Sequence, residues 1–248
     1  MMDQDKRLHR KIPLSMRLSM RSDCPYIEGQ TEQRIAVDIT ENPNCHDGLA
    51  RAGFRRVENW VYRPACPQCT ACLPWRVDVN RFIPSRNMAR IIKKNSDLTR
   101  RISSPDPTTA HYRLFKSYVT KRHDDGQMAR MDQHDFVSMI NNSPIETVLI
   151  SYYDSADMLV GAVLADLQSD GLSAVYSFFD AEQSDRSLGT FMVTDMMDIA
   201  KDLSLAWLYL GYYVAESRKM AYKARFGPAE IFKEGFWQAA DGALASSA

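Results

Sequence analysis

The chain has 248 residues, enough for one large domain or two smaller ones with a sizeable buried core. Its 31 basic and 31 acidic residues leave no formal net charge, so a nucleic-acid-binding surface would have to come from local grouping of cations. No stretch approaches the roughly 18 apolar residues of a membrane-spanning helix, and the charged N-terminus is not followed by the apolar segment of a secretory signal. With an odd count of five cysteines, these features predict a globular cytoplasmic protein without a disulfide framework.

The N-terminal third is predicted to consist of short elements around a cysteine-rich turn. Residues 1–22 are polar and basic, and we expect a flexible N-terminus there. Apolar alternation predicts short strands, and a stretch that ends at a glycine predicts a short helix. The strands are expected at 34–39, 57–62 and 76–82, and the helix at 46–53.

The cysteine-rich turn at residues 62–76 has the sequence YRPACPQCTACLPWR. Three thiols, on Cys66, Cys69 and Cys72, are separated by two residues each and lie between prolines. With Cys24 they reach the four protein ligands that tetrahedral zinc or an iron–sulfur cluster usually takes. A proline-braced turn with small buried thiols explains the same spacing. Both interpretations stay open.

A basic helix is predicted directly after this turn. Residues 85–96 begin with a serine that is a favourable N-cap, and helical spacing places four cations on one side. These cations are Arg86, Arg90, Lys93 and Lys94. The proline-containing segment 103–109 is the best candidate for a boundary. We therefore expect an N-terminal region at 23–103 with the cysteine motif and a C-terminal region at 104–240.

Longer apolar elements follow in the C-terminal region. Two helices are predicted at 109–123 and 132–141. An antiparallel meander of strands is predicted at 145–153, 158–167 and 171–180. The remaining elements are a helix from 186 to about 203, a strand at 206–213, a helix at 215–225 and a last strand at 231–237.

This order of elements matches the core of an acyl-CoA N-acyltransferase of the acetyltransferase (GNAT) type. We therefore predict an α+β fold that combines such a core with a smaller, cysteine-containing N-terminal α/β part. In such a core, the helix after the central strand can bind phosphates through its free N–H groups. Arg186, Ser187 and Gly189 stand at that position, although a simple capped helix start is the commoner explanation of such residues.

Several stretches, taken in order, resemble the bacterial branch of the arginyltransferase family, the aminoacyl-tRNA–protein transferases. The N-terminal ones are Gly29-Gln-Thr-Glu, Gly53-Phe-Arg-Arg and the cysteine-rich turn itself. The C-terminal ones are Ser187-Leu-Gly-Thr-Phe, Tyr209-Leu-Gly-Tyr-Tyr-Val and Met220-x-Tyr-Lys-x-x-Phe-Gly-Pro-x-Glu230. The ordered set extends from about residue 24 to residue 237 and is much more specific than any single stretch.

The resemblance implies that an aminoacyl group moves from its tRNA ester to the α-amine of a protein that begins with Asp or Glu. In the leucyl branch the donor is leucyl-tRNA, and the product enters the N-degron pathway of proteolysis. Some relatives carry an N-terminal Cys-x-x-Cys that contributes to an iron–sulfur site, whereas here the second position of that pair is Ile27. Zinc or an iron–sulfur cluster thus stays a candidate cofactor that the transfer chemistry does not require.

Candidate roles follow from this reaction. The acidic side chain of the acceptor calls for an arginine, because a guanidinium binds a carboxylate through two hydrogen bonds; Arg76 is our first choice and Arg63 the second. The candidates for holding the acceptor ammonium are Glu32, Asp180 and Glu182. Tyr176 is a candidate for relaying a proton or donating to the oxyanion.

The donor RNA needs cations for its phosphates. The candidates are the basic helix at 85–96, the helix start at Arg186, and a second basic group that includes Lys219 and Lys223. A solvated helix face explains such charge runs without any ligand.

Other functions remain open at this point. Arginyl-tRNA could replace leucyl-tRNA as the donor, since the donor pocket cannot be derived from the sequence. An acetyl-CoA N-acetyltransferase would share the core, and a non-catalytic metal- or RNA-binding protein would account for the cysteines and the basic helices.

Overall fold

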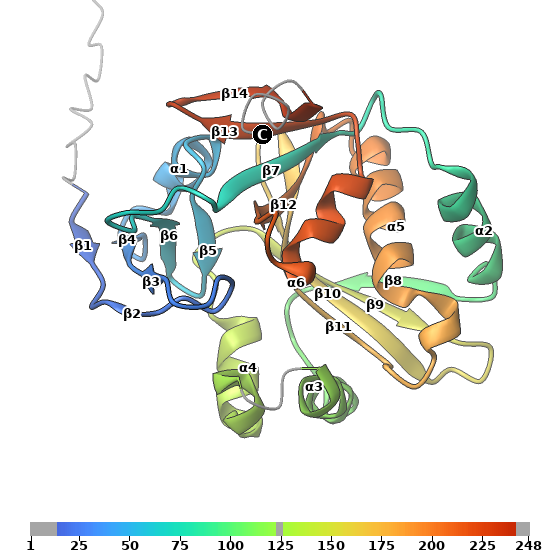
Figure 1. Ribbon diagram of the computed structural model, residues 1–248. Helices are drawn as coiled ribbons and strands as arrows, with labels where there is room; N and C mark the ends of the chain where they lie inside the picture. Colours follow the sequence, from blue (N-terminus) through green and yellow to red (C-terminus); the bar gives the residue numbers. More distant parts are fainter. Residues whose placement is uncertain (1–13, 123–125, 242–248) are drawn as a thin grey trace, which may run out of the picture.

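An eight-stranded mixed sheet forms the centre of the protein in the computed structural model, which describes residues 14–122 and 126–241 (Figure 1). Its strands, in spatial order, are β14 (Phe236–Ala239), β13 (Ala229–Lys233), β7 (Leu73–Asp78), β12 (Trp207–Tyr213), β11 (Gly171–Phe179), β10 (Leu159–Leu167), β9 (Thr147–Tyr153) and β8 (Thr99–Ser103). A smaller sheet beside it has the order β1 (Met16–Leu18), β4 (Arg34–Asp38), β6 (Trp60–Pro64) and β5 (Arg55–Val57). A two-stranded sheet pairs β2 (Ser22–Asp23) with β3 (Thr31–Glu32).

Helices cover both faces of the large sheet (Figure 1). One face carries α5 (Leu188–Asp202), against which α2 (Arg86–Lys94) packs. The other carries α3 (Thr109–Arg122) and α4 (Gln133–Asn141). The remaining helices and 3-10 turns are α1 (His46–Arg51), α6 (Arg218–Ala221), η1 (Pro43–Cys45), η2 (Gln127–Arg130), η3 (Ser184–Arg186) and η4 (Tyr222–Arg225).

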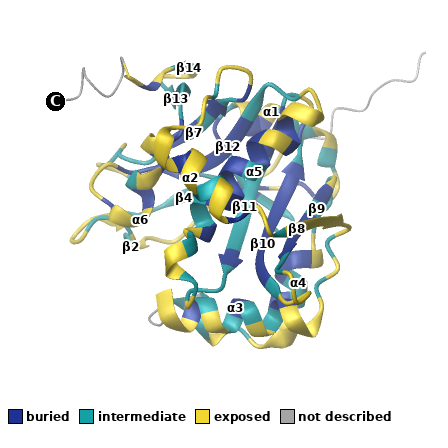
Figure 2. Ribbon diagram, turned by 90° about the vertical axis from the view of Figure 1, so that its right-hand side faces the viewer, coloured by how far each residue is buried: buried dark blue, intermediate teal, exposed yellow. Residues whose placement is uncertain are grey.

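The predicted meander and the fold class built on it are confirmed. Strands β9, β10 and β11 pair antiparallel, and α5 then leads to β12, which runs parallel to β11. Residues of β10 alternate between the two apolar clusters: Val163 and Ala165 pack under α5, and Ala162 and Leu164 pack under α3 and α4. This period of two explains why β10 is apolar almost throughout, since it is buried on both faces (Figure 2).

The N-terminal region contributes directly to the large sheet. Strand β7 lies between β12 and β13, and β8 forms one edge next to β9. Both strands precede the boundary expected at 103/104, so this boundary does not separate two sheets. Residues 14–22, expected within a flexible N-terminus, contain β1 paired with β4, while residues 1–13 lie outside the described residues.

Two predicted strands are instead parts of hairpins. The stretch 57–62 contains the turn between β5 and β6, where Glu58 has a φ of 50°, and 231–237 contains the turn between β13 and β14. Positive φ values at Glu234 (57°) and Gly235 (92°) form that second turn. The helix predicted at 215–225 is the short α6 followed by the 3-10 turn η4, whereas the predicted N-cap of α2 is confirmed, because the Ser85 hydroxyl accepts the Met88 N–H at 3.3 Å.

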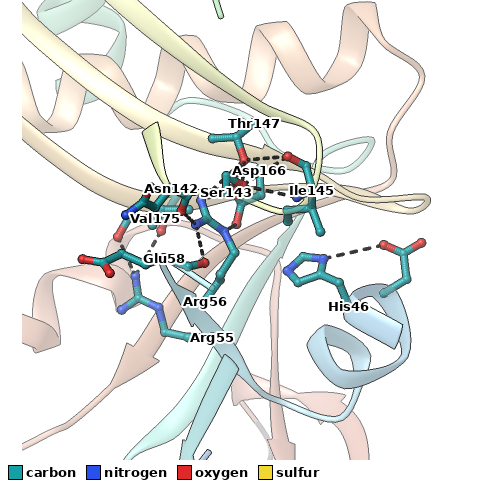
Figure 3. Close-up of polar contacts among 12 residues, drawn as sticks. His46, Arg55, Arg56, Glu58, Asn142, Ser143, Ile145, Thr147, Asp166 and Val175 are labelled. Atoms are coloured by element: carbon teal, nitrogen blue, oxygen red, sulfur yellow. Dashed lines mark hydrogen bonds and ion pairs between the residues drawn. The ribbon is translucent and has the colours of Figure 1, made fainter. Parts of the chain in front are cut away.

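A buried ion pair fixes the β5–β6 hairpin to the large sheet (Figure 3). Arg56 donates to both carboxylate oxygens of Asp166 on β10, at 2.8 and 2.6 Å, and both side chains are 1% exposed. The same guanidinium donates to the carbonyls of Glu58 and Asn142. The small sheet is therefore held in one place against the meander.

Within the described part of the chain, no helix is long and apolar enough to cross a membrane.

Candidate functional site

The parallel strands β11 and β12 separate after a short contact. Their pairing is limited to Gly171–Ser173 opposite Trp207–Tyr209. Beyond it both strands are irregular: Val175 has no partner on β10, and Leu210 has none on β7. Such bulges re-aim backbone groups and end pairing, and they are common next to active sites. The result is a splay, by which we mean the gap between β11 and β12 beyond residues 173 and 209.

Arg55, from β5, occupies this splay. Its Nη2 donates to the carbonyl oxygens of Ala174 and Val175, at 3.1 and 3.0 Å (Figure 3). On the opposite side, a Cβ placed on Gly211 would collide with the Arg55 guanidinium, and the φ of Gly211 is +74°. Both the conformation and the close approach therefore require glycine at this position.

Three buried polar groups lie on β12, beside it and on β11; of these, the Tyr176 ring packs against Phe115 and Phe178 on the α3 face. The Tyr212 hydroxyl lies within hydrogen-bonding distance of the carbonyls of Gly53 (3.1 Å) and Tyr62 (2.9 Å). Lys223 donates to the Tyr212 carbonyl, and burial, reinforced by the nearby Arg55 charge, lowers the pKa of Lys223 well below its usual value. Within the described residues, the buried Tyr176 hydroxyl on β11 has no hydrogen-bond partner. Burial raises the pKa of Tyr176, so it is a protonated donor at neutral pH.

A separate cavity of about 470 Å³ lies near the splay; Arg55 and Gly211 do not line it but line a much smaller pocket of about 10 Å³. Tyr212 lines the larger cavity and is the neighbour of Gly211 in the chain. The charged side chains in its lining are Glu32, Arg34, Arg63, Lys233 and Glu234. Three are cations and two are anions, and Arg34 is paired with Glu32. The cavity is therefore suited to a small polar group that carries both charges.

Arg63 and Glu32 are the two expected acceptor-binding residues that line this cavity. Arg63 donates through Nη1 to the Ala52 carbonyl at 3.1 Å and lies 5.2 Å from the centre of the Phe54 ring. These contacts use one Nη1 donor of Arg63 and hold the guanidinium beside Ala52 and Phe54, neither of which lines the cavity.

Arg76, our first choice for acceptor binding from the sequence, lies on β7 and outside the cavity lining. Its Nε and Nη2 donate to Glu230 at 2.9 and 2.6 Å, and its Nη1 donates to the Tyr209 hydroxyl at 3.2 Å. The rings of Trp207 and Trp237 are centred 3.8 and 4.2 Å from its guanidinium carbon. Arg76 thus joins β7, β12 and β13 and does not line the cavity.

Asp180 and Glu182 lie in the loop after β11. The Asp180 carboxylate accepts the Glu182 N–H and the Gln183 side-chain amide, each at 3.0 Å. Glu182 is 74% exposed and pairs with Lys121. The structure brings neither carboxylate into the lining of the cavity.

The four cysteines of the proposed metal set gather at the cavity. Cys24, Cys66, Cys69 and Cys72 all line it as free thiols. Burial, followed by the neighbouring thiols, raises the pKa of Cys72 to about 12, so this thiol is protonated at neutral pH. Across 14–122 and 126–241, no group of three or more His, Cys, Asp or Glu side chains is arranged to hold a metal ion.

The expected RNA-binding cations fall into exposed and buried sets. Arg86, Arg90, Lys93, Lys94 and Lys219 are exposed. Lys223 is 4% exposed and so does not share a surface with Lys219.

At the helix start, Arg186 contacts the segment that follows α2, because its Nε donates to Asn95 at 2.9 Å and its Nη2 binds Asp97. Ser187 has a φ of 53° and its side chain makes no capping bond, while Gly189 packs against the Phe179 ring.

Arg55 was not among the candidate residues predicted from the sequence. It precedes the strand predicted at 57–62, whereas in the structure it begins β5. Its partners lie about 120 residues later on β11, and no local pattern indicates them.

Comparison with known proteins identifies relatives along most of the chain. Residues 22–90 match the N-terminal part of the arginine-tRNA-protein transferase family, and residues 110–233 match its C-terminal part. The chain is 44% identical over 217 residues to an aspartate/glutamate leucyltransferase of Paramagnetospirillum magneticum, covering 87% of this chain and 89% of the relative. A protein of the same name from Dinoroseobacter shibae is 42% identical over 227 residues, covering 87% and 80%. Among solved structures, FemX has a similar fold, with a TM-score of 0.56 at 8% identity over 94% of this chain and 90% of FemX.

Proposed function

The chain belongs to the arginine-tRNA-protein transferase family and is therefore an aminoacyltransferase, and on this premise we propose that it moves leucine from leucyl-tRNA to the α-amine of proteins that begin with Asp or Glu. The observation that carries the proposal is the 44% identity over 217 residues to a relative named for this activity. The product would carry an N-terminal leucine, which marks it for proteolysis as an N-degron. The aminoacyl-tRNA donor supports a cytoplasmic location.

Aminolysis of an aminoacyl ester needs positioning more than strong base catalysis. An α-amine has a pKa of about 7.7–8.0, so part of it is uncharged at neutral pH. Holding the amine against the ester can supply roughly 7–11 kcal/mol, more than one proton transfer usually provides. A cavity that holds the acceptor close to the ends of β11 and β12, where we place the ester, would meet this requirement.

We assign the acceptor N-terminus to the cavity. A guanidinium can bind a carboxylate through two parallel hydrogen bonds, and Arg63 is a lining residue of the cavity whose contact with Ala52 uses only one of its donors. Glu32 lines the same cavity and is the group we assign to the ammonium. The contacts of Arg76 with Glu230 and Tyr209 make it the second choice.

Tyr176 is our candidate donor to the oxyanion. Its buried hydroxyl has no partner among the described residues, and β11 carries it into the region beyond the contact with β12. A buried donor that is already unpaired does not have to break a bond in order to bind the developing charge. Asp180 and Glu182 would act, if at all, through the loop that follows this strand.

The exposed face of α2 is our candidate surface for the tRNA phosphates, with Lys219 as a further contact. Arg86, Arg90 and Lys93 are exposed there, and Lys94 is paired with Asp185 at 2.6 Å. Arg186 supports this surface by its bonds to Asn95 and Asp97.

A transfer assay tests the activity and its donor together. Purified protein is incubated with leucyl-tRNA or arginyl-tRNA and with peptides that begin with Asp, Glu, Lys or Arg. We expect leucine on the Asp and Glu peptides alone. Arginine on the same peptides would establish the arginyl alternative, and transfer to the basic peptides only, or to none, would contradict the proposal.

An Arg63→Ala variant tests the acceptor assignment. We expect a higher KM for Asp peptides with an unchanged KM for leucyl-tRNA, because the guanidinium would bind the acceptor alone. Arg51→Ala is the matched control, since Arg51 is an exposed arginine of α1 that does not line the cavity. An Arg63→Ala enzyme with the normal KM for both substrates would remove Arg63 from the acceptor site.

A further inference from the structure

Arg55 has no assigned role in the chemistry so far, although it fills the splay. Its guanidinium connects three parts of the chain: it originates on β5, donates to two carbonyls of β11 and packs against Gly211 of β12. The bulge at Val175 turns the carbonyls of Ala174 and Val175 toward the same donor. In a regular strand, successive carbonyls point in opposite directions.

These two carbonyls create an electrostatic problem in the splay. Each presents the negative end of its dipole to the gap. Attack of the amine on the ester would build negative charge there on the carbonyl oxygen of the ester. A guanidinium is always charged and has several donors in a fixed plane. Arg55 therefore satisfies both carbonyls and brings a permanent positive charge into the gap.

The other nearby cation does not take over this task. Lys223 is buried and donates to the Tyr212 carbonyl, and its lowered pKa favours the uncharged amine. The Arg55 charge contributes to that shift, after burial. The permanent charge beside the two carbonyls is thus that of Arg55.

We propose that Arg55 is a positioning residue for aminoacyl transfer, which keeps β11 and β12 apart and offsets the carbonyls of Ala174 and Val175 so that the splay accepts the developing oxyanion. The inference rests on the proposed function, since it assigns the reacting ester to the splay. Arg55 acts through the strand backbone and the local potential, and recognition of the tRNA and of the acceptor lies with other residues.

Kinetic constants of Arg55 variants test this role. Arg55→Met removes the charge and both hydrogen bonds, and we expect kcat to fall by about 100-fold, because a misplacement of about 1 Å at the reacting groups can cost that much. KM for leucyl-tRNA and for an Asp peptide should stay within about twofold, because ground-state binding is untouched. Arg55→Lys keeps a cation but lacks the planar guanidinium, so its kcat should lie between those of the wild type and Arg55→Met. Arg51→Met controls for the loss of an arginine near this position in the chain.

The possible outcomes separate the two proposals. A folded Arg55→Met enzyme with wild-type kcat, or with a raised KM and unchanged kcat, would overturn the role of Arg55. Should Arg55→Met fail to fold, Arg55→Lys decides: lower kcat at constant KM supports the role, and unchanged kcat overturns it. If wild-type protein transfers no amino acid, the proposed function fails instead. Amide hydrogen exchange then still tests whether Arg55 holds the two strands in place. We expect faster exchange at residues 171–179 in folded Arg55→Met than in the wild type. Equal exchange rates would contradict the role of Arg55.

Discussion

Loss of the buried Arg56–Asp166 pair should destabilise the protein strongly. In Arg56→Met, the Asp166 carboxylate would stay in the interior, where it is 1% exposed, without the two charged hydrogen bonds at 2.8 and 2.6 Å. Removing one partner of a buried pair typically costs about 3–5 kcal/mol, because an uncompensated charge is left behind. For a chain of this size, such a loss corresponds to a fall in Tm of about 10 °C.

Urea unfolding followed by circular dichroism measures this loss directly. The double variant Arg56→Met/Asp166→Leu should recover part of the stability, since no charge is then stranded. Arg101→Met is the control, because Arg101 and Asp157 form an exposed pair (53% and 68%) worth about 0–1 kcal/mol. If Arg56→Met costs no more than Arg101→Met, the reasoning that the pair anchors the β5–β6 hairpin is wrong.

Three further predictions concern pH, backbone conformation and RNA binding. Burial lowers the pKa of His111, so its contribution to folding stability should be constant above the unfolded pKa of about 6.5, and stability should fall as the pH drops below that value. In His111→Gln, the Tm should therefore fall less steeply between pH 8 and pH 5 than in the wild type. A Tm that falls equally steeply in both proteins would contradict this. Gly53 has a φ of +82°, and a Cβ added there would lie 2.8 Å from Pro74, so Gly53→Ala should lower the free energy of unfolding in urea by about 2 kcal/mol. Gly48→Ala, whose added Cβ would meet nothing within 4 Å, should not destabilise the protein. Equal effects of the two substitutions would refute the strain argument. Arg90→Glu/Lys93→Glu should raise KM for leucyl-tRNA and reduce the salt slope of binding by about 1 or more, with the peptide KM unchanged; an identical salt slope would remove α2 from the RNA surface.

The sequence predicted the acyltransferase-like core well, because its signals are local. The three meander strands are apolar runs separated by turn residues, and α5 has a continuous apolar pattern, so each element could be identified on its own. The N-terminal region was harder. Short strands separated by tight turns at Glu58 and Glu234 were merged into single strands, since a non-glycine residue with positive φ leaves no clear trace in sequence.

The candidate site depended on contacts between distant segments, which local patterns do not show. Arg63 and Arg76 lie near the two ends of the cysteine-rich turn, and Arg76 was the first choice, yet Arg76 is enclosed by Trp207, Trp237 and Glu230, which come more than 120 residues later. Lys223 shares a basic stretch with Lys219 but is buried beneath the C-terminal end of β12. The environment of Arg76 and of Lys223 is therefore set by strands that lie far from them in the sequence.

The central claim is that this chain forms a peptide bond between leucine and an acidic N-terminus. Fragment-ion mass spectrometry of an Asp-starting peptide, incubated with the protein, leucyl-tRNA and acetyl-CoA together, tests it most directly. We predict one added leucyl residue, located on the α-amine, and no added acetyl group. An acetylated peptide, or a peptide that remains unmodified in the presence of intact leucyl-tRNA, would contradict the account.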